Sequence, residues 1–317
     1  MRGNCPSHLT TGRAAEGLLL GALGVLGFSF TLPATRIAVA QLDATVVGLG
    51  RAVVAAVLAL AVVGIRREPI PPRHLWLRIA MAGMGVVVGF PLFSALALRH
   101  LTSAHSAVIV GLLPAATAVM AVARAGERPA LGFWAACACG LASVLAFAAA
   151  EGPGTIQGAD VFVLIAVLLG GFGYAEGGAL SREIGGWQVI CWALVASLPV
   201  TVPAAVTAAL RSGLSAGRDA WLGFAYVSVV SMFLAFIPWN RGLATGGIAR
   251  IAQVQLAQPV LTLLWSVLLL GERVGPRTAA ASLLVLASVA ATQRAGARGA
   301  SVAGGRIAAR GRVAHGE

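Results

Sequence analysis

Two ionisable residues, Arg51 and Glu176, stand inside long apolar stretches of the sequence. A charged side chain in hydrocarbon is costly unless it is paired or hydrated, so each residue is a candidate solute-binding position. The alternatives are that Arg51 extends its side chain to the membrane surface and that Glu176 is hydrated near a helix end. If Glu176 is shielded from water, it also becomes a candidate carrier of a coupling proton.

A polar group of residues lies ahead of a proline in the last third of the sequence. Gln255, Gln258 and Thr262 are spaced at i, i+3 and i+7, which places them on one face of a helix. On that face they could line a cavity and hydrogen-bond a solute. The alternative is hydrogen bonding between helices, which would fasten this segment to its neighbours.

Two prolines and a Trp-Asn pair complete the candidate positions. Pro114 and Pro259 each remove a backbone donor, which predicts a helix kink, or a freed carbonyl that points at a ligand. Trp239 and Asn240 follow a proline at a predicted helix end and are further solute-binding candidates. Trp is also common at membrane boundaries without any ligand, which is the alternative for this pair.

The sequence lacks the residue sets that enzymes and metal proteins use. It has no phosphate-binding glycine loop, no zinc-ligand spacing and no Ser/His/Asp set at one membrane level. His105 has no partner at metal-ligand spacing, so a solvated or packed histidine is expected there. We therefore expect no catalytic residue, no metal, no cofactor and no enzyme activity.

The elements that must position these residues are membrane-spanning helices. Of 317 residues 58% are hydrophobic and 11% charged, whereas soluble domains carry roughly 25% charged residues. The apolar stretches do not alternate as barrel strands would, and they approach the roughly 20 residues that a helix needs to cross a bilayer. Ten spans are predicted, each with boundaries uncertain by several residues, at 17–35, 44–65, 75–98, 103–123, 130–150, 159–180, 187–209, 219–239, 248–270 and 277–293.

The net charge is +12, and all 23 basic residues are arginine, since the chain has no lysine. The arginines stand singly between spans or cluster near 66–78 and in the tail, and no basic face is interleaved with aromatic residues, so nucleic-acid binding is not expected. With the N-terminus in the cytoplasm, most arginines fall in cytoplasmic segments, as the positive-inside rule requires. Both termini of this multi-pass protein are therefore predicted to be cytoplasmic.

An internal repeat relates the two halves of the chain. A shift of 145 residues places Pro114 on Pro259, Thr117 on Thr262, and Gly126-Glu127-Arg128 on Gly271-Glu272-Arg273. Because each half holds an odd number of spans, the second half must be inverted in the membrane. Inverted repeats are a recurring device of secondary transporters, in which they build one central site that opens to either side.

These residues resemble a known family. The run Phe93–Arg99, the Pro114 helix followed by Gly126-Glu127-Arg128-Pro129, and the second copy from Gln258-Pro259 to Gly271-Glu272-Arg273 look like EamA domains of the drug/metabolite transporter superfamily. The resemblance implies an all-α integral membrane protein of about ten helices in two inverted five-helix repeats with a central cavity. The predicted organisation is a cytoplasmic N-terminal segment at 1–14, repeats at 15–150 and 158–293, and a disordered, Arg-rich cytoplasmic tail at 294–317.

The repeat and the resemblance lead to one hypothesis and one rival. The hypothesis is a secondary transporter or exporter that moves a small metabolite or drug across the inner membrane by alternating access, without ATP hydrolysis and with protons as a candidate coupling ion. The rival is a membrane scaffold or assembly protein that retains the fold and transports nothing. The expected partners are the solute and the lipid bilayer. The protein is expected to be a monomer or a homodimer, because small-residue faces can support close packing within one chain or between two copies.

Overall fold

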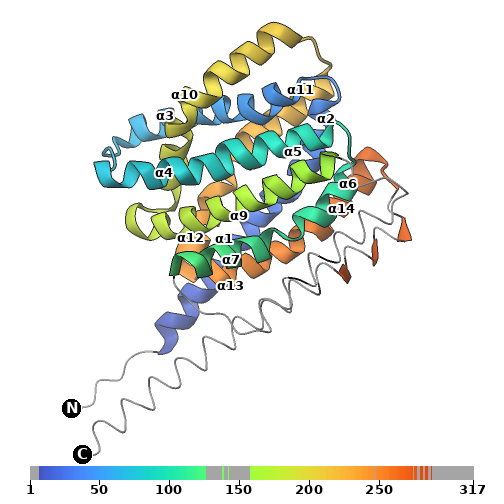
Figure 1. Cartoon of the computed structure of the whole chain (residues 1–317). Helices are drawn as coiled ribbons and strands as arrows, with labels where there is room; N and C mark the ends of the chain where they lie inside the picture. The colour runs from blue at the N-terminus through green and yellow to red at the C-terminus, as the bar shows by residue number, and fades with distance from the viewer. Residues whose placement is uncertain are drawn as a thin grey trace, which may run out of the picture.

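The computed structural model describes residues 7–125, 158–246 and 248–273, together with residues 138, 142, 275, 276, 279, 280, 283, 284 and 287. Every regular element in this part of the chain is helical (Figure 1). In chain order the elements are α1 (Ser7–Ser29), α2 (Thr31–Val39), η1 (Val46–Gly50), α3 (Arg51–Arg66), η2 (Arg73–Leu75), α4 (Trp76–Gly83), η3 (Met84–Gly89), α5 (Phe90–Leu98), α6 (Ser103–Val110), α7 (Leu113–Ala125), α9 (Gly158–Ile184), α10 (Gly186–Ser212), α11 (Arg218–Tyr226), η4 (Val227–Leu234), α12 (Phe236–Gly246), α13 (Ile248–Ala252), η5 (Gln253–Leu256) and α14 (Ala257–Leu270).

Seven helical stretches in the described residues are long and apolar enough to cross a membrane. They are Ala15–Val39, Val46–Arg66, Arg73–Leu98, Ser103–Ala123, Gly158–Ile184, Gly186–Ser212 and Arg218–Gly246, and the shorter apolar helix Ala257–Leu270 follows. The seven coincide with predicted spans one to four and six to eight. Predicted spans 130–150 and 277–293 fall outside the described residues except at isolated positions, and the predicted tail 294–317 falls outside them entirely. The count of ten spans therefore stays a prediction.

Three of the predicted spans are interrupted near their middle. Phe30 separates α1 from α2, Gly111-Leu112 separates α6 from α7, and the 3-10 turn η5 separates α13 from α14. Pro114 is the second residue of α7 and Pro259 the third of α14, so each proline lies in a first helical turn, where its missing N–H costs least. The last two breaks occupy matching positions of the two repeats.

Wide π-helical turns interrupt three other spans. They are η1, η3 and η4, which lie in spans two, three and eight. The 145-residue shift carries residues 84–89, which form η3, onto residues 229–234 within η4, so the repeats share this feature too. A π turn accommodates one residue more than an α turn and is frequent at functional sites.

Contacts between helix termini define two ends of the bundle. We call the end at which α1 begins the α1 end, and the end at which α6 begins the α6 end. The α1 end holds Glu16, Arg66, Arg78, Glu183, Trp187 and Arg241, and the α6 end holds Arg36, Gln41, Asp43, Leu98, Arg99, Ser103, Asp160, Gly217 and Glu272. Helix α7 runs toward the α1 end, where α13 contacts it, whereas α9 starts beside α6 at the opposite end. Residues 125 and 158 therefore lie toward opposite ends of the bundle.

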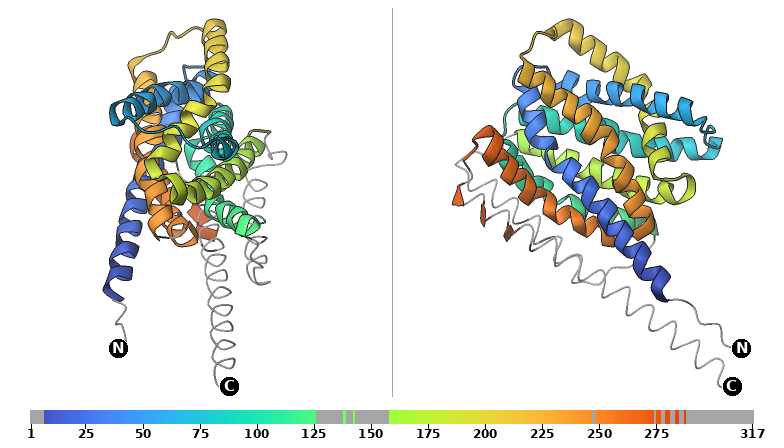
Figure 2. Two further views of the ribbon diagram at one scale, coloured as in Figure 1. Left: turned by 90° about the vertical axis from the view of Figure 1, so that its left-hand side faces the viewer. Right: turned by 180° about the vertical axis from the view of Figure 1, so that it is seen from behind.

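The two repeats are interlocked rather than side by side. Helix α1 of the first repeat packs along α12 of the second, as the views in Figure 2 show. Glycines permit this approach: a Cβ placed on Gly17 would lie 2.7 Å from Gly246 Cα, and one on Gly24 would lie 2.8 Å from Trp239 Cβ. Small residues at crossing points are the usual basis of close helix packing in membranes, where water expulsion supplies no driving force.

Candidate functional site

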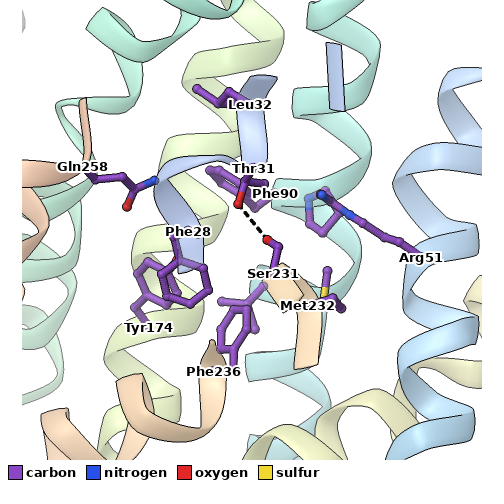
Figure 3. A pocket seen from close by; sticks show the side chains of 13 residues that line it. Phe28, Thr31, Leu32, Arg51, Phe90, Tyr174, Ser231, Met232, Phe236 and Gln258 are labelled. Carbon is purple, nitrogen blue, oxygen red and sulfur yellow. Dashed lines mark hydrogen bonds between the residues drawn. The ribbon is translucent and has the colours of Figure 1, made fainter. Parts of the chain in front are cut away.

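A cavity lies midway between the two ends, where the broken and widened helices of both repeats meet (Figure 3). Its empty volume, which includes open solvent at its mouth, is about 430 Å³. The first repeat contributes Phe28, Thr31, Leu32, Arg51, Val86, Phe90 and Pro91, and the second contributes Gly170, Tyr174, Ser231, Met232, Phe236 and Gln258.

Arg51 is the charged member of this lining. It directly follows η1, and its side chain is 1% exposed. Its guanidinium extends from α3 toward the middle of the group (Figure 3). Within the described part of the chain neither Nε nor Nη1 has a hydrogen-bond partner. A buried guanidinium with unsatisfied donors is a strong attractor for an anion, because the guanidinium has lost hydration without gaining a counter-charge.

Polar groups from three other helices complete the cavity wall. The hydroxyls of Thr31 and Ser231 are 2.7 Å apart and hydrogen-bond one another across the two repeats. Gln258, from α14, reaches in from the side opposite Arg51 (Figure 3). Its Oε1 has no hydrogen-bond partner in the described residues. The cavity thus presents a cation on one side and an amide on the other.

Aromatic rings close the cavity toward the α1 end. Phe28 packs edge-on against Phe236 with ring centroids 4.9 Å apart, and Tyr174 lies 5.9 Å from the same ring. Trp239 stands behind this wall, 5.5 Å from Tyr174 and 6.0 Å from Phe28. The sequence candidate Trp239 therefore supports the cavity wall without being one of its lining residues.

Glu176 lies beyond the aromatic wall, in an ion-pair cluster. It is 1% exposed, and Arg78 Nε donates to its Oε1 at 2.6 Å. The Nη1 of Arg78 also donates to Glu183, which is exposed at the α1 end. Sequence reasoning identified Glu176 but missed Arg78, whose only signal was its place in the Arg-rich segment before span three.

The remaining sequence candidates lie around the cavity rather than in its lining. Gln255 is buried, and neither of its amide atoms has a hydrogen-bond partner in the described residues. The Thr262 hydroxyl donates a hydrogen bond to the carbonyl of Ser29 at 2.7 Å, which gives a partner to the backbone acceptor at the last residue of α1. Asn240 donates to the carbonyl of Gly186 at 3.3 Å, near the α1 end. Thr262 thus makes an interhelical bond of the kind given above as the alternative for its polar group, and Asn240 makes one as well.

Acidic residues of the second repeat hold the start of α6 at the opposite end. The Glu272 carboxylate accepts bonds from the backbone of Ser103 and Ala104 and from the Ser103 hydroxyl, all between 2.9 and 3.0 Å. A carboxylate on the free N–H groups of a helix start is strongly favoured. His105 packs against Asp160, with Nε2 and Oδ1 2.8 Å apart, and Asp160 is 2% exposed. The sequence offered no partner for His105, because Asp160 is 55 residues away.

The groups that line this cavity are suited to binding a solute. Among the described residues no three His, Cys, Asp or Glu side chains gather at metal-binding distances. The cavity lining offers a cation, hydroxyls, an amide and aromatic faces, which orient and hold a solute. The cavity lies between the two repeats, beside broken helices.

Comparison with known proteins gives three findings. The model of the EamA-like transporter family matches twice, over residues 15–149 and 157–293. A Bacillus subtilis (strain 168) protein named "Uncharacterized transporter YdeK" is 44% identical over 282 residues, which are 89% of this chain and 98% of that protein. A solved crystal structure aligns with a TM-score of 0.64 over 90% of this chain and 98% of its own at 19% identity, a likeness of fold.

Proposed function

Because this chain belongs to the EamA-like transporter family, we propose that it is a secondary transporter that moves a small solute through its central cavity by alternating access. The observation that carries the proposal is the cavity itself, which both repeats line and which adjoins matched helix breaks. Transporter sites typically lie at such repeat interfaces, at the level of the membrane midplane. The family and the curated relative support transport, and the cavity supplies a place for the solute.

Two sets of contacts, one on each side of the cavity, supply the gates in this proposal. Toward the α1 end the aromatic wall and the Arg78–Glu176 ion pair tie α4 to α9. Toward the α6 end Glu272 ties α6 to the chain after α14. Opening of one set while the other holds would expose the cavity to one side at a time. We accordingly assign Glu176 to the gate at the α1 end and Arg51 to the solute.

We place the protein in the inner membrane with the α1 end in the cytoplasm. The described residues support this orientation, because Arg66, Arg67, Arg73 and Arg78 all lie at the α1 end. Positive charge concentrates on cytoplasmic loops, so this end is the one that stays inside. Export and import both fit this arrangement.

A reversible cross-link at the α6 end tests alternation. The hydroxyl oxygens of Ser103 on α6 and Ser266 on α14 are 2.8 Å apart, so a Ser103→Cys/Ser266→Cys pair in a cysteine-free chain should form a disulfide under mild oxidation. We expect oxidation to stop solute movement in proteoliposomes and reduction to restore it. The single variants Ser103→Cys and Ser266→Cys are the controls and should be insensitive to oxidant.

The assay itself uses a pooled panel of organic anions, amino acids, nucleosides, sugars and cationic drugs, with and without a pH gradient. Dependence on the gradient would identify protons as the coupling ion. Full transport in the oxidised double variant would contradict gating at the α6 end. Folded protein that moves no solute of any class would favour the scaffold or assembly role instead.

A further inference from the structure

We propose that the solute is a small organic anion, with a carboxylate bound by Arg51 and a flat apolar body held between the aromatic rings of the cavity. This inference deepens the transport function proposed above and rests on it. It follows from the balance of charge in the cavity, from the direction of its polar groups and from the nature of its walls.

The charge balance of the cavity is positive. Its lining residues include Arg51 and no Asp or Glu. Glu176, the nearby acid on α9, is held by Arg78 behind the aromatic wall and does not line the cavity. The other described acidic side chains lie toward the two ends of the bundle, several of them in ion pairs or helix caps: Glu16, Asp43, Glu68, Asp160, Glu183, Asp219 and Glu272. A buried cation without a counter-charge therefore awaits an anion from outside the chain.

The geometry of the guanidinium selects a carboxylate among anions. Nε and Nη1 of Arg51 both lack partners, and each forms one edge of the planar guanidinium together with Nη2. A planar fork of donors fits the two oxygens of a carboxylate better than it fits a spherical ion. Gln258 faces Arg51 across the cavity and has a free amide oxygen, which can accept a bond from a hydroxyl or N–H on the far side of the solute.

The walls between these polar groups select the body of the solute. Phe28, Tyr174 and Phe236 form the wall toward the α1 end, and the ring of Phe90 also lines the cavity. Such surfaces favour a flat ring, which packs offset or edge-on against them. Aromatic rings also attract cations, but a cation here would be held near Arg51 without any lining carboxylate. An amino acid would likewise bury an ammonium group without a counter-charge.

A matched set of ring compounds tests whether the protein prefers an anion to neutral, cationic and zwitterionic solutes. Benzoate and 4-hydroxybenzoate carry the anion, benzamide is neutral, benzylamine is a cation and phenylalanine is a zwitterion. We expect titration calorimetry in detergent to show binding of the two acids at least about tenfold tighter than that of the other three, the difference typical of a charge-assisted hydrogen bond. The hydroxyl of 4-hydroxybenzoate should strengthen binding further, and Gln258→Leu should remove that gain.

Variants at Arg51 test whether this residue recognises the carboxylate. Arg51→Gln should weaken benzoate binding at least about tenfold, and Arg51→Lys should retain part of it as a point charge without the fork. Arg211→Gln is the matched control, since Arg211 is exposed at the end of α10 and should leave binding unchanged. A thermal melt of each variant verifies that it is folded.

The outcomes separate this inference from the transport proposal. Equal or tighter binding of benzylamine or benzamide, binding of chloride alone, or no binding of either acid by folded protein would each overturn the anion assignment. Uptake of cations or neutral solutes that Arg51→Gln does not reduce would overturn it too, and would leave transport standing. Arg51-dependent binding of benzoate without any movement across proteoliposomes would support the anion site and count against transport.

Discussion

At the scale of single residues, the proposed solute site depends most on Arg51. Its guanidinium is buried in a membrane-spanning helix and its Nε and Nη1 find no partner in the described chain. Isolated charges in such surroundings are destabilising, and proteins retain them where function requires the charge. The neighbouring Gln258 and Gln255 also leave amide atoms without hydrogen bonds. The centre of the molecule is therefore less stable than an all-apolar packing would be.

Replacement of this charge should stabilise the empty protein. Arg51→Met keeps much of the side-chain volume and removes the unpaired donors, so we expect an apparent Tm higher by about 2–4 °C for each kcal/mol regained, together with loss of solute binding. Circular dichroism melts in detergent without added anions measure the change. Arg36→Met is the control, because Arg36 Nη1 donates to the Leu98 carbonyl and its loss should lower the Tm. A lower Tm for Arg51→Met would mean that Arg51 is paired within the protein.

Some residues of the candidate site could be predicted from the sequence and others could not. Arg51 and Gln258 could be named from the sequence because polarity inside an apolar span is conspicuous. Phe28, Tyr174 and Phe236 could not, because an aromatic residue in a helix that is apolar on every face gives no periodic contrast. The ion pair of Glu176 escaped for another reason: its partner is 98 residues distant, and no local pattern links them.

The helices themselves could be predicted well at the scale of elements, and their irregularities only in part. Span positions follow directly from hydropathy, because lipid tolerates little else. Pro114 and Pro259 indicated kinks, and the structure has a full break directly ahead of each. The π turns η3 and η4 carry no sequence signal of their own. They depend on how span three and span eight pack against their neighbours.

Glycine contacts at η3 show how tightly that packing is set. A Cβ on Gly85 would lie 2.5 Å from the Leu169 carbonyl oxygen and 2.7 Å from Gly173 Cα, so Gly85→Ala forces η3 away from α9. We expect destabilisation of about 1–3 kcal/mol, measured as a fall in the apparent Tm. Gly64→Ala on α3 is the matched control, since nothing lies within 4 Å of the added Cβ, and its effect should be neutral or slightly stabilising. Equal melts for the two variants would contradict the close contact between η3 and α9.

The arrangement of the whole molecule follows from the interlocking of its repeats. The 145-residue shift relates two repeats, and the structure has matching irregularities in both, at the breaks after α6 and α13 and at η3 and η4. The inversion of the second half stays a prediction. Sequence alone did not reveal that α1 leaves its own half to pack on α12. The moving bodies of the transporter are therefore expected to combine helices of both repeats.

Membrane orientation is a prediction at this scale. In a chain whose four cysteines have been replaced, Ile70→Cys lies in the exposed loop at the α1 end and Ser215→Cys in the exposed loop at the α6 end. A membrane-impermeant maleimide should label Ser215→Cys in intact spheroplasts and Ile70→Cys only after permeabilisation. The reverse pattern would invert the proposed topology, and labelling of both in intact spheroplasts would contradict loops at opposite ends.

The glycine seam between α1 and α12 also bears on how the protein is made. Helix α1 is synthesised well before α12, and the residues that contact its glycines begin only at Val230. Until that segment is made, the glycine face of α1 lacks the partner that it has in the structure, and a single apolar helix is stable in the bilayer without one. We therefore expect insertion of α1 to precede its packing on α12. A ribosome stalled before α12 would leave inserted helices that have no completed bundle to join.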